Sequence, residues 1–159
     1  MGKTFVPFAL LLALVAGVAG ISAKDTQSPK YKNVEVKHFV VADGVALTQN
    51  FVNVFYDALR DQLQKDAIAG QVVEEGTAIP DADAADSIVV EGKFTLFKPA
   101  GRSMSSPGKV DWEIDVYRKS DHSLITTLTR DLSTPGWKED ALAKACGQQA
   151  AHDIKKGLK

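Results

Sequence analysis

Hydrophobic and polar residues alternate along three consecutive stretches of the chain, at residues 88–96, 110–116 and 124–128. The apolar positions of the first two stretches are Ile88, Val90, Gly92, Phe94 and Leu96, followed by Val110, Trp112, Ile114 and Val116. Side chains two residues apart lie on the same face of a β-strand, so each stretch has the spacing of a half-buried strand. The three stretches therefore predict an antiparallel meander with one apolar face and one polar face.

A further strand is expected before the meander, over residues 31–41. Its apolar side is predicted to carry Val34, Val36, His38 and Val40, and its polar side Glu35, Lys37 and Phe39. A histidine on the apolar side of a strand is more often a core or edge residue with a backbone partner than a metal ligand, and no second His or Cys lies at metal-binding spacing. Residues 71–75 are expected to add a short edge strand.

Two amphipathic helices are predicted, one over residues 48–69 and one that begins at Thr134 and Pro135. In the first, hydrophobic residues recur every three or four positions, Thr48 or Asn50 can cap the start, and Gly70 is placed to end it in a left-handed conformation. The apolar stripe of the second consists of Leu142, Cys146, Ala150 and Ile154. This position indicates that the cysteine is a small core residue and not a nucleophile.

These elements follow one another in the order β-α-β-β-β-β-α. Because the sheet has a single apolar face and each helix has to bury a stripe, both helices are expected on that face. We therefore predict an α+β fold: a two-layer sandwich of a mainly antiparallel, four- to five-stranded sheet with two helices on one face. A chain of 159 residues fits one domain, which we place at residues 31–159.

The first 23 residues predict a secretory signal peptide. Lys3 supplies a positive charge, an almost continuously apolar run follows, and small residues precede a cleavage site between Ala23 and Lys24. Residues 24–30 would then form a flexible polar tether. The alternative is a retained membrane helix, because residues 5–21 reach the roughly 17-residue minimum for a span. With the leader cleaved, we expect a periplasmic or secreted protein without a membrane anchor.

Composition and charge narrow the range of partners. The chain has 19 Lys and Arg against 20 Asp and Glu, a formal net charge of −1 at pH 7. A nearly balanced charge favours neither nucleic acid nor anionic lipid. The single cysteine excludes an internal disulfide, so the stability of the fold has to come from its core. We expect the partner to be another envelope protein, and the oligomeric state stays open.

Motifs of catalysis and metal binding are weak in this chain. Ser106 and Lys109 have the S-x-x-K spacing of penicillin-recognising serine enzymes, but the Pro-Gly pair between them breaks the helical turn that this motif needs. The aspartates of the loop before the meander, Asp81, Asp83 and Asp86, lack the Gly and the terminal Glu of a helix-loop-helix calcium site. We therefore expect no enzyme, no cofactor and no metal. The alternative is a small envelope hydrolase-like enzyme with a site assembled around His38 or His122.

The remaining candidates for function lie on the surface. On the polar face of the sheet, Lys93 is expected to form cross-strand pairs with Glu113 or Asp115, which can be purely structural. Beside this face, the loop of residues 98–109 gathers three basic residues around a Ser/Gly segment. They are Lys98, Arg102 and Lys109. Loops on rigid scaffolds often bind, although many are simply solvated. We expect a non-enzymatic binding or structural module that docks an envelope protein through this face or this loop.

Two segments, ADSIVVEGKFTLFKPAGRS and GKVDWEIDVYRKSDHSLI, together with the alanine-rich helix that follows, resemble DUF4410, a family of uncharacterised exported bacterial proteins. Gly92 after Glu91, Pro99 and Arg102 in the loop, and Gly108 at the start of the second meander strand match the family pattern. The loop is shorter than in the family and the SDHS turn replaces one that carries glycine. The lipoprotein cysteine of many members is missing. The resemblance implies an envelope protein and no particular activity.

Overall fold

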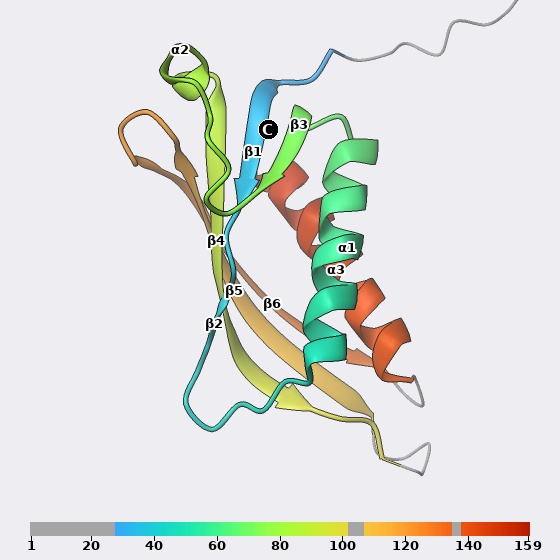
Figure 1. Ribbon diagram of the computed structural model, residues 1–159. Coiled ribbons are helices and arrows are strands. Elements are labelled where there is room, and N and C mark those ends of the chain that lie inside the picture. Colours follow the sequence, from blue (N-terminus) through green and yellow to red (C-terminus); the bar gives the residue numbers. More distant parts are fainter. Residues whose placement is uncertain (1–27, 102–106, 135–137) are drawn as a thin grey trace, which may run out of the picture.

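The computed structural model describes residues 28–101, 107–134 and 138–159 (Figure 1). Within these ranges, six strands form one sheet, and two long helices and one short helix accompany it. The elements in chain order are β1 (Tyr31–Val36), β2 (Val40–Val41), α1 (Gln49–Lys65), β3 (Ala69–Glu74), α2 (Asp81–Ala84), β4 (Ser87–Lys98), β5 (Gly108–Arg118), β6 (Leu124–Thr134) and α3 (Glu139–Gly157). The predicted leader with Ala23, and residues 24–27 of the predicted tether with Lys24, lie outside the described residues. Residues 28–30 of the tether are described, and the Lys30 ammonium contacts the Leu158 carbonyl oxygen.

The sheet has the order β3-β1-β4-β5-β6, and β2 pairs with the second half of β4. The meander of β4, β5 and β6 is antiparallel, as predicted. The prediction of a mainly antiparallel sheet of four to five strands is matched only in part, because the sheet has six strands and is mixed. Of the five strand pairings, β1 with β3, β1 with β4 and β2 with β4 are parallel. Alternation does not encode strand direction, and the long connection through α1 is of the kind that joins parallel strands.

The first predicted strand is interrupted by one extra residue. Val36 pairs with Val90, but Val40 pairs with Lys93, so three residues of the first segment stand opposite two residues of β4. A bulge of this kind moves the side chains that follow it to the other face of the sheet. Val40 is consequently 64% exposed, whereas the uninterrupted alternation placed it on the apolar side.

The bulge also reverses which of the neighbouring side chains, Phe39 and His38, is buried. The Phe39 side chain was predicted on the polar side and is buried, whereas His38 was predicted on the apolar side and is exposed. The ring of Phe39 lies over Gly92, where an added Cβ would come within 2.6 Å of the ring atoms. It also lies 5.4 Å from the Phe55 ring and 5.5 Å from the Phe94 ring, between centroids. Gly92 is therefore the position on β4 that makes room for the ring.

A second irregularity lies near the end of β4. Phe94 pairs with Trp112 and both side chains face the helices, as predicted, but the register shifts before Leu96. Phe97 consequently lies on the helix side, 5.0 Å from the ring of Phe51, while Leu96 is 37% exposed. The prediction that Leu96 belongs to the apolar face was therefore wrong, because the alternation continues through the irregularity without showing it.

The start of α1 is as predicted and its end is not. The Thr48 hydroxyl accepts a hydrogen bond of 3.0 Å from the Phe51 N–H and so caps the first turn. The helix ends at Lys65, before the predicted residue 69. The left-handed residue after it is Ala67, with φ 51°, whereas Gly70 lies inside β3.

α3 begins at Glu139, after the predicted start, because Thr134 is the last residue of β6. Residues 135–137 lie outside the described part of the chain. α3 runs in the same direction as α1 and lies very close to it: a Cβ at Gly147 would come within 2.4 Å of the Phe55 carbonyl oxygen. The glycine therefore sets how closely the two helices approach.

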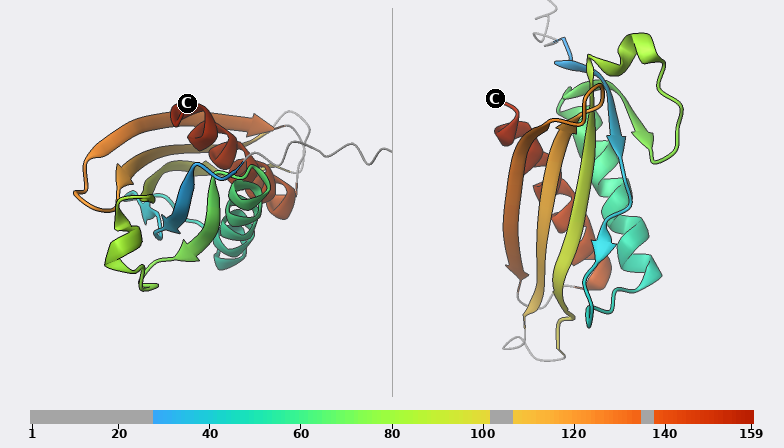
Figure 2. Two further views of the ribbon diagram at one scale, coloured as in Figure 1. Left: turned by 90° about the horizontal axis from the view of Figure 1, so that it is seen from above. Right: turned by 90° about the vertical axis from the view of Figure 1, so that its left-hand side faces the viewer.

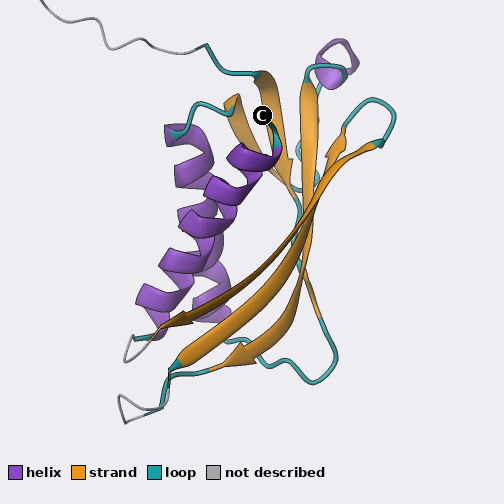
Figure 3. Ribbon diagram, turned by 180° about the vertical axis from the view of Figure 1, so that it is seen from behind, coloured by secondary structure: helices purple, strands orange, loops and turns teal. Residues whose placement is uncertain are grey.

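The core lies between the two long helices and one face of the sheet (Figures 2 and 3). Its largest fully buried side chains include Trp112, Phe51, Phe55, Phe94, Leu59, Leu63, Ile88, Ile114, Leu142 and Ile154. Cys146 is also fully buried, and its burial raises the thiol pKa to about 12. The prediction that both long helices cover the same face is confirmed. The segment between β3 and β4, with the short helix α2, lies on the opposite side (Figure 1).

Candidate functional site

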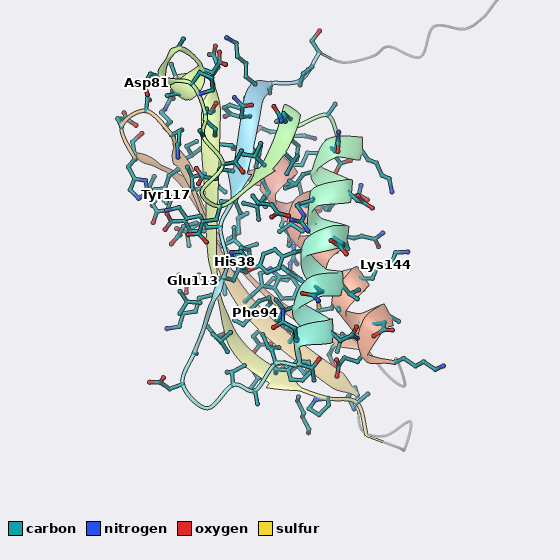
Figure 4. The ribbon with its side chains drawn as sticks, viewed as in Figure 1. His38, Asp81, Phe94, Glu113, Tyr117 and Lys144 are labelled. Atoms are coloured by element: carbon teal, nitrogen blue, oxygen red, sulfur yellow. The ribbon has the colours of Figure 1, made fainter. Side chains whose placement is uncertain are left out.

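The polar face of the sheet lies on the side away from α1 and α3, where Figure 4 shows Glu113 and Tyr117, while Phe94 points towards the helices. The register sets Lys93 directly opposite Glu113, and both residues are exposed. Asp115 stands opposite Glu91 instead. This face therefore presents a charged pair of opposite sign, with a pair of carboxylates next to it.

Each carboxylate of that second pair is held by neighbours. Asp115 accepts a hydrogen bond of 2.5 Å from the Thr127 hydroxyl. Glu91 lies 2.6 Å from the Lys37 ammonium, and this hydrogen bond is the main cause of the raised pKa of Lys37. The Nε2 atom of His122 also lies near this carboxylate, 3.9 Å from the Glu91 Oε1 atom. Lys37 and Thr127 thus offset part of the repulsion between the two acids.

His122 stacks flat on Tyr117, with 4.4 Å between ring centroids and 8° between ring planes. It sits in the turn between β5 and β6 with a left-handed φ of 53°. Desolvation and the nearby Asp115 raise the pKa of Tyr117. The turn therefore places an imidazole ring over the end of the polar face, with 60% of its side chain exposed.

The β1 side of the same end of this face is buried. Glu35 was predicted on the polar side and lies there, but only 4% of it is exposed. In the register it stands between Val73 and Val89, which are also buried. The ammonium of Lys119 contacts its carboxylate. A partly buried ion pair and two valines therefore cover the face near β1, and its exposed part lies on β4 and β5 around Lys93 and Glu113.

The predicted basic loop is described only at its ends. Lys98 and Lys109 stand opposite each other, where β4 ends and β5 begins. The Lys109 ammonium lies 3.2 Å from the Asp111 carboxylate. Arg102, and Ser106 of the weak serine-enzyme motif, lie outside the described residues. The structure thus brings two of the three predicted basic residues together at one end of the sheet.

The two histidines of the alternative, enzymatic prediction contact carboxylates and aromatic rings. The backbone N–H and the Nδ1 atom of His38 each lie 3.1 Å from the Glu75 carboxylate, and the former bond is the main cause of the lowered pKa of Glu75. Among the described residues, neither His38 nor His122 is hydrogen-bonded to a hydroxyl or thiol. In the same part of the chain, no group of three or more His, Cys, Asp or Glu side chains is placed to hold a metal ion.

Two of the three aspartates of the calcium alternative, Asp83 and Asp86, lie beside Lys32. The Lys32 ammonium is 2.7 Å from the Asp83 carboxylate and 3.7 Å from the Asp86 carboxylate. The hydrogen bond from Lys32 to Asp83 is the main cause of the raised pKa of the lysine. A lysine therefore supplies the positive charge next to these two acids.

A cavity of about 310 Å³, which the sequence did not predict, lies between α1 and the ends of β1 and β3. From α1 it is lined by Gln49, Val52, Asn53, Tyr56, Asp57 and Arg60. From the sheet side it is lined by Val36, His38 and Glu74. His38 reaches this cavity because the bulge turns it away from the core, which is a common role of bulges.

Tyr56 and Arg60 define the chemistry of the cavity. The Tyr56 ring lies 5.3 Å from the His38 ring, its hydroxyl accepts a hydrogen bond from the Phe39 N–H, and burial raises its pKa to about 12. Arg60 lies 2.8 Å from the Asp57 carboxylate and also contacts Glu74. The cavity therefore has a protonated phenol, an imidazole and a guanidinium that is already shared by two acids.

Several solved structures have a similar fold. The PelC dodecamer from Paraburkholderia phytofirmans matches with a TM-score of 0.59 at 11% identity, over 79% of this chain and 89% of that one. Protein XCC0632 from Xanthomonas campestris, of family DUF330, matches with 0.53 at 14% identity, over 84% and 85%. Lipoprotein GNA1162 from Neisseria meningitidis matches with 0.50 at 7% identity, over 79% and 99%.

No family model and no curated protein matches the chain, so the resemblance to DUF4410 stays a prediction. The structural likenesses show a shared fold, and one of the proteins with that fold is a bacterial lipoprotein. In the described part of the chain, none of the helices combines the length and the apolar character of a membrane span. A shared fold alone assigns neither a binding partner nor export to this chain.

Proposed function

We propose that this chain is an exported, non-enzymatic binding module of the bacterial cell envelope that docks another envelope protein through the polar face of its sheet. The observation that carries the proposal is the one-sided cover of the sheet: α1 and α3 cover one face, and Lys93 and Glu113 stand exposed on the other. A rigid sheet fixes such charges in one geometry, which favours specific recognition. The basic end at Lys98 and Lys109 continues this surface.

The occurrence of the fold in a lipoprotein supports a place in the envelope by analogy. It adds to the predicted signal peptide, which is the basis for export. A hydrolase site around His38 or His122 is a weaker reading, because the described contacts of both rings are to carboxylates and to tyrosine rings.

The test exchanges the charges of the exposed pair. In cells that express the full chain, Lys93→Glu with Glu113→Lys should leave the fold intact and change the proteins recovered by crosslinking and mass spectrometry. A matched control exchanges two exposed charges on the helices, with Lys144→Glu and Asp61→Lys, and should leave the recovered proteins unchanged. The proposal is wrong if the sheet variant recovers the same partners as the unmodified chain.

A second copy of this chain is one partner that the same experiment can reveal. PelC is a dodecamer, and its fold is similar. Light scattering after size-exclusion chromatography would give the mass of the assembly. A monomer at all concentrations would exclude self-assembly, and the crosslinked partners would then have to be other proteins.

A further inference from the structure

The sheet has an unfilled position beside β2. β3 ends at Glu74, and the chain turns away at Gly76, with φ 81°, towards the other side of the sheet (Figure 1). β4 continues to Lys98, and along this second half its partner on that side is the two-residue strand β2. In the described part of the chain, no further strand pairs with β2, so β2 is an edge of the sheet.

The backbone of β2 offers hydrogen-bonding groups at this edge. The Ala42 N–H donates to the Phe94 carbonyl oxygen at 2.9 Å, so it points towards β4. Backbone groups of neighbouring residues in a strand point in opposite directions, and the N–H and C=O of Val41 therefore point outwards. The Phe39 N–H, two residues earlier, also points away from β4 and donates to the Tyr56 hydroxyl. The Phe39 N–H is thus already satisfied, and the outward-pointing groups of Val41 are the template for an added strand.

The side chains of β2 are exposed as well. Val40 is 64% and Val41 is 41% exposed, and these are two of the four large hydrophobic residues that the described surface exposes. The register places Val40 beside Lys93 on the polar face and Val41 beside Phe94 on the helix face. Edge strands are usually protected by charges or proline, and this one has apolar side chains on both faces. A segment lying along the edge would cover part of both.

The cavity beside this edge has an excess of negative charge. Asp57 and Glu74 line it with 73% and 66% of their side chains exposed, and Glu75 next to it holds His38. Against these three carboxylates stand the guanidinium of Arg60, which is 28% exposed and already contacts two of them, and the Lys37 ammonium, which is hydrogen-bonded to Glu91 and acts on Glu75 only from a distance. The exposed and incompletely neutralised groups are acids, so the cavity favours a cationic side chain.

We propose that β2 binds an extended segment of a partner protein, which pairs with the backbone of Val41 and places a lysine or arginine side chain in the cavity between α1 and β3. Strand addition gives affinity through the main chain, and a pocket for one side chain gives specificity. This surface differs from the polar face proposed above, and the two can fail independently.

The probes are synthetic peptides added to the full chain. One alternates threonine and valine around a central lysine, and a second has glutamate in the central position. Two further lysine peptides carry backbone N-methyl groups on the odd or on the even residues, which block hydrogen bonding along one side of the strand only. Binding is measured by fluorescence anisotropy, and the site by amide chemical shifts of the ¹⁵N-labelled protein.

The lysine peptide should bind roughly threefold to tenfold more tightly than the glutamate peptide, as expected for a cation near partly exposed carboxylates. One of the two N-methylated peptides should lose binding and the other should keep it. The shifted amides should include those of His38, Val40 and Val41. The proposal is overturned if no peptide binds, if both methylated peptides behave alike, or if the shifts lie around Glu113 instead.

Variants of the protein provide a second, independent test. Asp57→Asn with Glu74→Gln removes two charges from the cavity and should abolish the preference for the lysine peptide. The matched control, Asp61→Asn with Asp131→Asn, removes the same charge from exposed residues that do not line the cavity and should keep the preference. Equal effects of the two double variants would show that only net charge matters, which contradicts the proposal.

Discussion

Replacing Phe39 by alanine is expected to destabilise the fold by about 3–5 kcal/mol, the usual cost of removing a buried phenylalanine side chain. The Phe39 residue is 6% exposed, and its ring contacts the rings of Phe55, Tyr56 and Phe94 at centroid distances of 5.4, 5.8 and 5.5 Å. Ring pairs of this geometry each contribute about 0.5–1.5 kcal/mol beyond buried area. The expected cost therefore lies in the upper part of the range.

The neighbouring Val40 provides the matched comparison. It is 64% exposed, so Val40→Ala should change the free energy of unfolding by no more than about 0.5 kcal/mol. An uninterrupted strand over residues 31–41 predicts the opposite order, with Val40 buried and Phe39 on the polar side. The two substitutions thus decide whether the bulge exists.

A double-mutant cycle tests the contact of Phe39 with Gly92. Gly92→Ala alone should cost about 1–3 kcal/mol, because the new Cβ would lie within 2.6 Å of the ring. In the Phe39→Ala background the ring is gone, and the same substitution should cost much less. The expected coupling is about 1–2 kcal/mol, of the size found for residues in direct contact.

Urea denaturation followed by circular dichroism measures all four variants, and the slope m shows whether the two-state approximation still holds. Two results would refute the reasoning. One is a larger loss of stability for Val40→Ala than for Phe39→Ala. The other is additivity of the Phe39 and Gly92 substitutions, since independent sites do not share a contact.

Three further predictions concern buried groups. Arg130→Met should lower the free energy of unfolding by about 2–3 kcal/mol in a urea titration, because Asp153 is 5% exposed and loses hydrogen bonds of 2.8 and 2.5 Å. The cost is less than for a fully buried pair because the Arg130 side chain is 42% exposed. An unchanged urea midpoint would contradict this. Lys119→Met should lower the melting temperature, because the buried Glu35 carboxylate loses the Lys119 ammonium as its partner. Adding Glu35→Gln should restore part of the loss. If the melting temperature does not recover, the Lys119–Glu35 pair is not the cause. Burial raises the thiol pKa of Cys146 from 9.0 to about 12, so the folded state favours the protonated thiol, and the stability that this contributes is present below about pH 9 and lost as pH rises towards 12. Cys146→Ala should therefore lose less stability over that pH range than the unmodified chain, and equal alkaline losses in the two proteins would show that the thiol does not contribute.

The elements that sequence predicted well are those specified by local spacing. The meander and the two long helices follow from periods of two and of three to four residues, and their shared face follows from the single apolar side of the sheet. Strand direction has no such signal. The parallel pairings of β1 with β3 and β4 depend on where the long connections return, which the spacing of hydrophobic residues does not record.

The bulges explain most of the remaining errors. In the stretch VKHFVV, reading through at period two buries His38 and Val40, whereas one extra residue buries Phe39. Gly92 was the available signal, because a glycine on the apolar side of a strand often marks the close approach of a bulky group. The cavity beside His38 depends on this bulge and on where β3 ends, so sequence alone gave no indication of it.

The contribution of α3 has a consequence for the time course of biosynthesis. This helix supplies six fully or almost fully buried residues to the core, namely Leu142, Ala143, Cys146, Ala150, Ala151 and Ile154, and it is the last element in chain order. A nascent polypeptide that has emerged only as far as residue 134 contains all strands of the sheet, but α3 does not yet cover its apolar face. Such an intermediate is prone to aggregate until synthesis of α3 is complete, and it is a natural client for a holding chaperone.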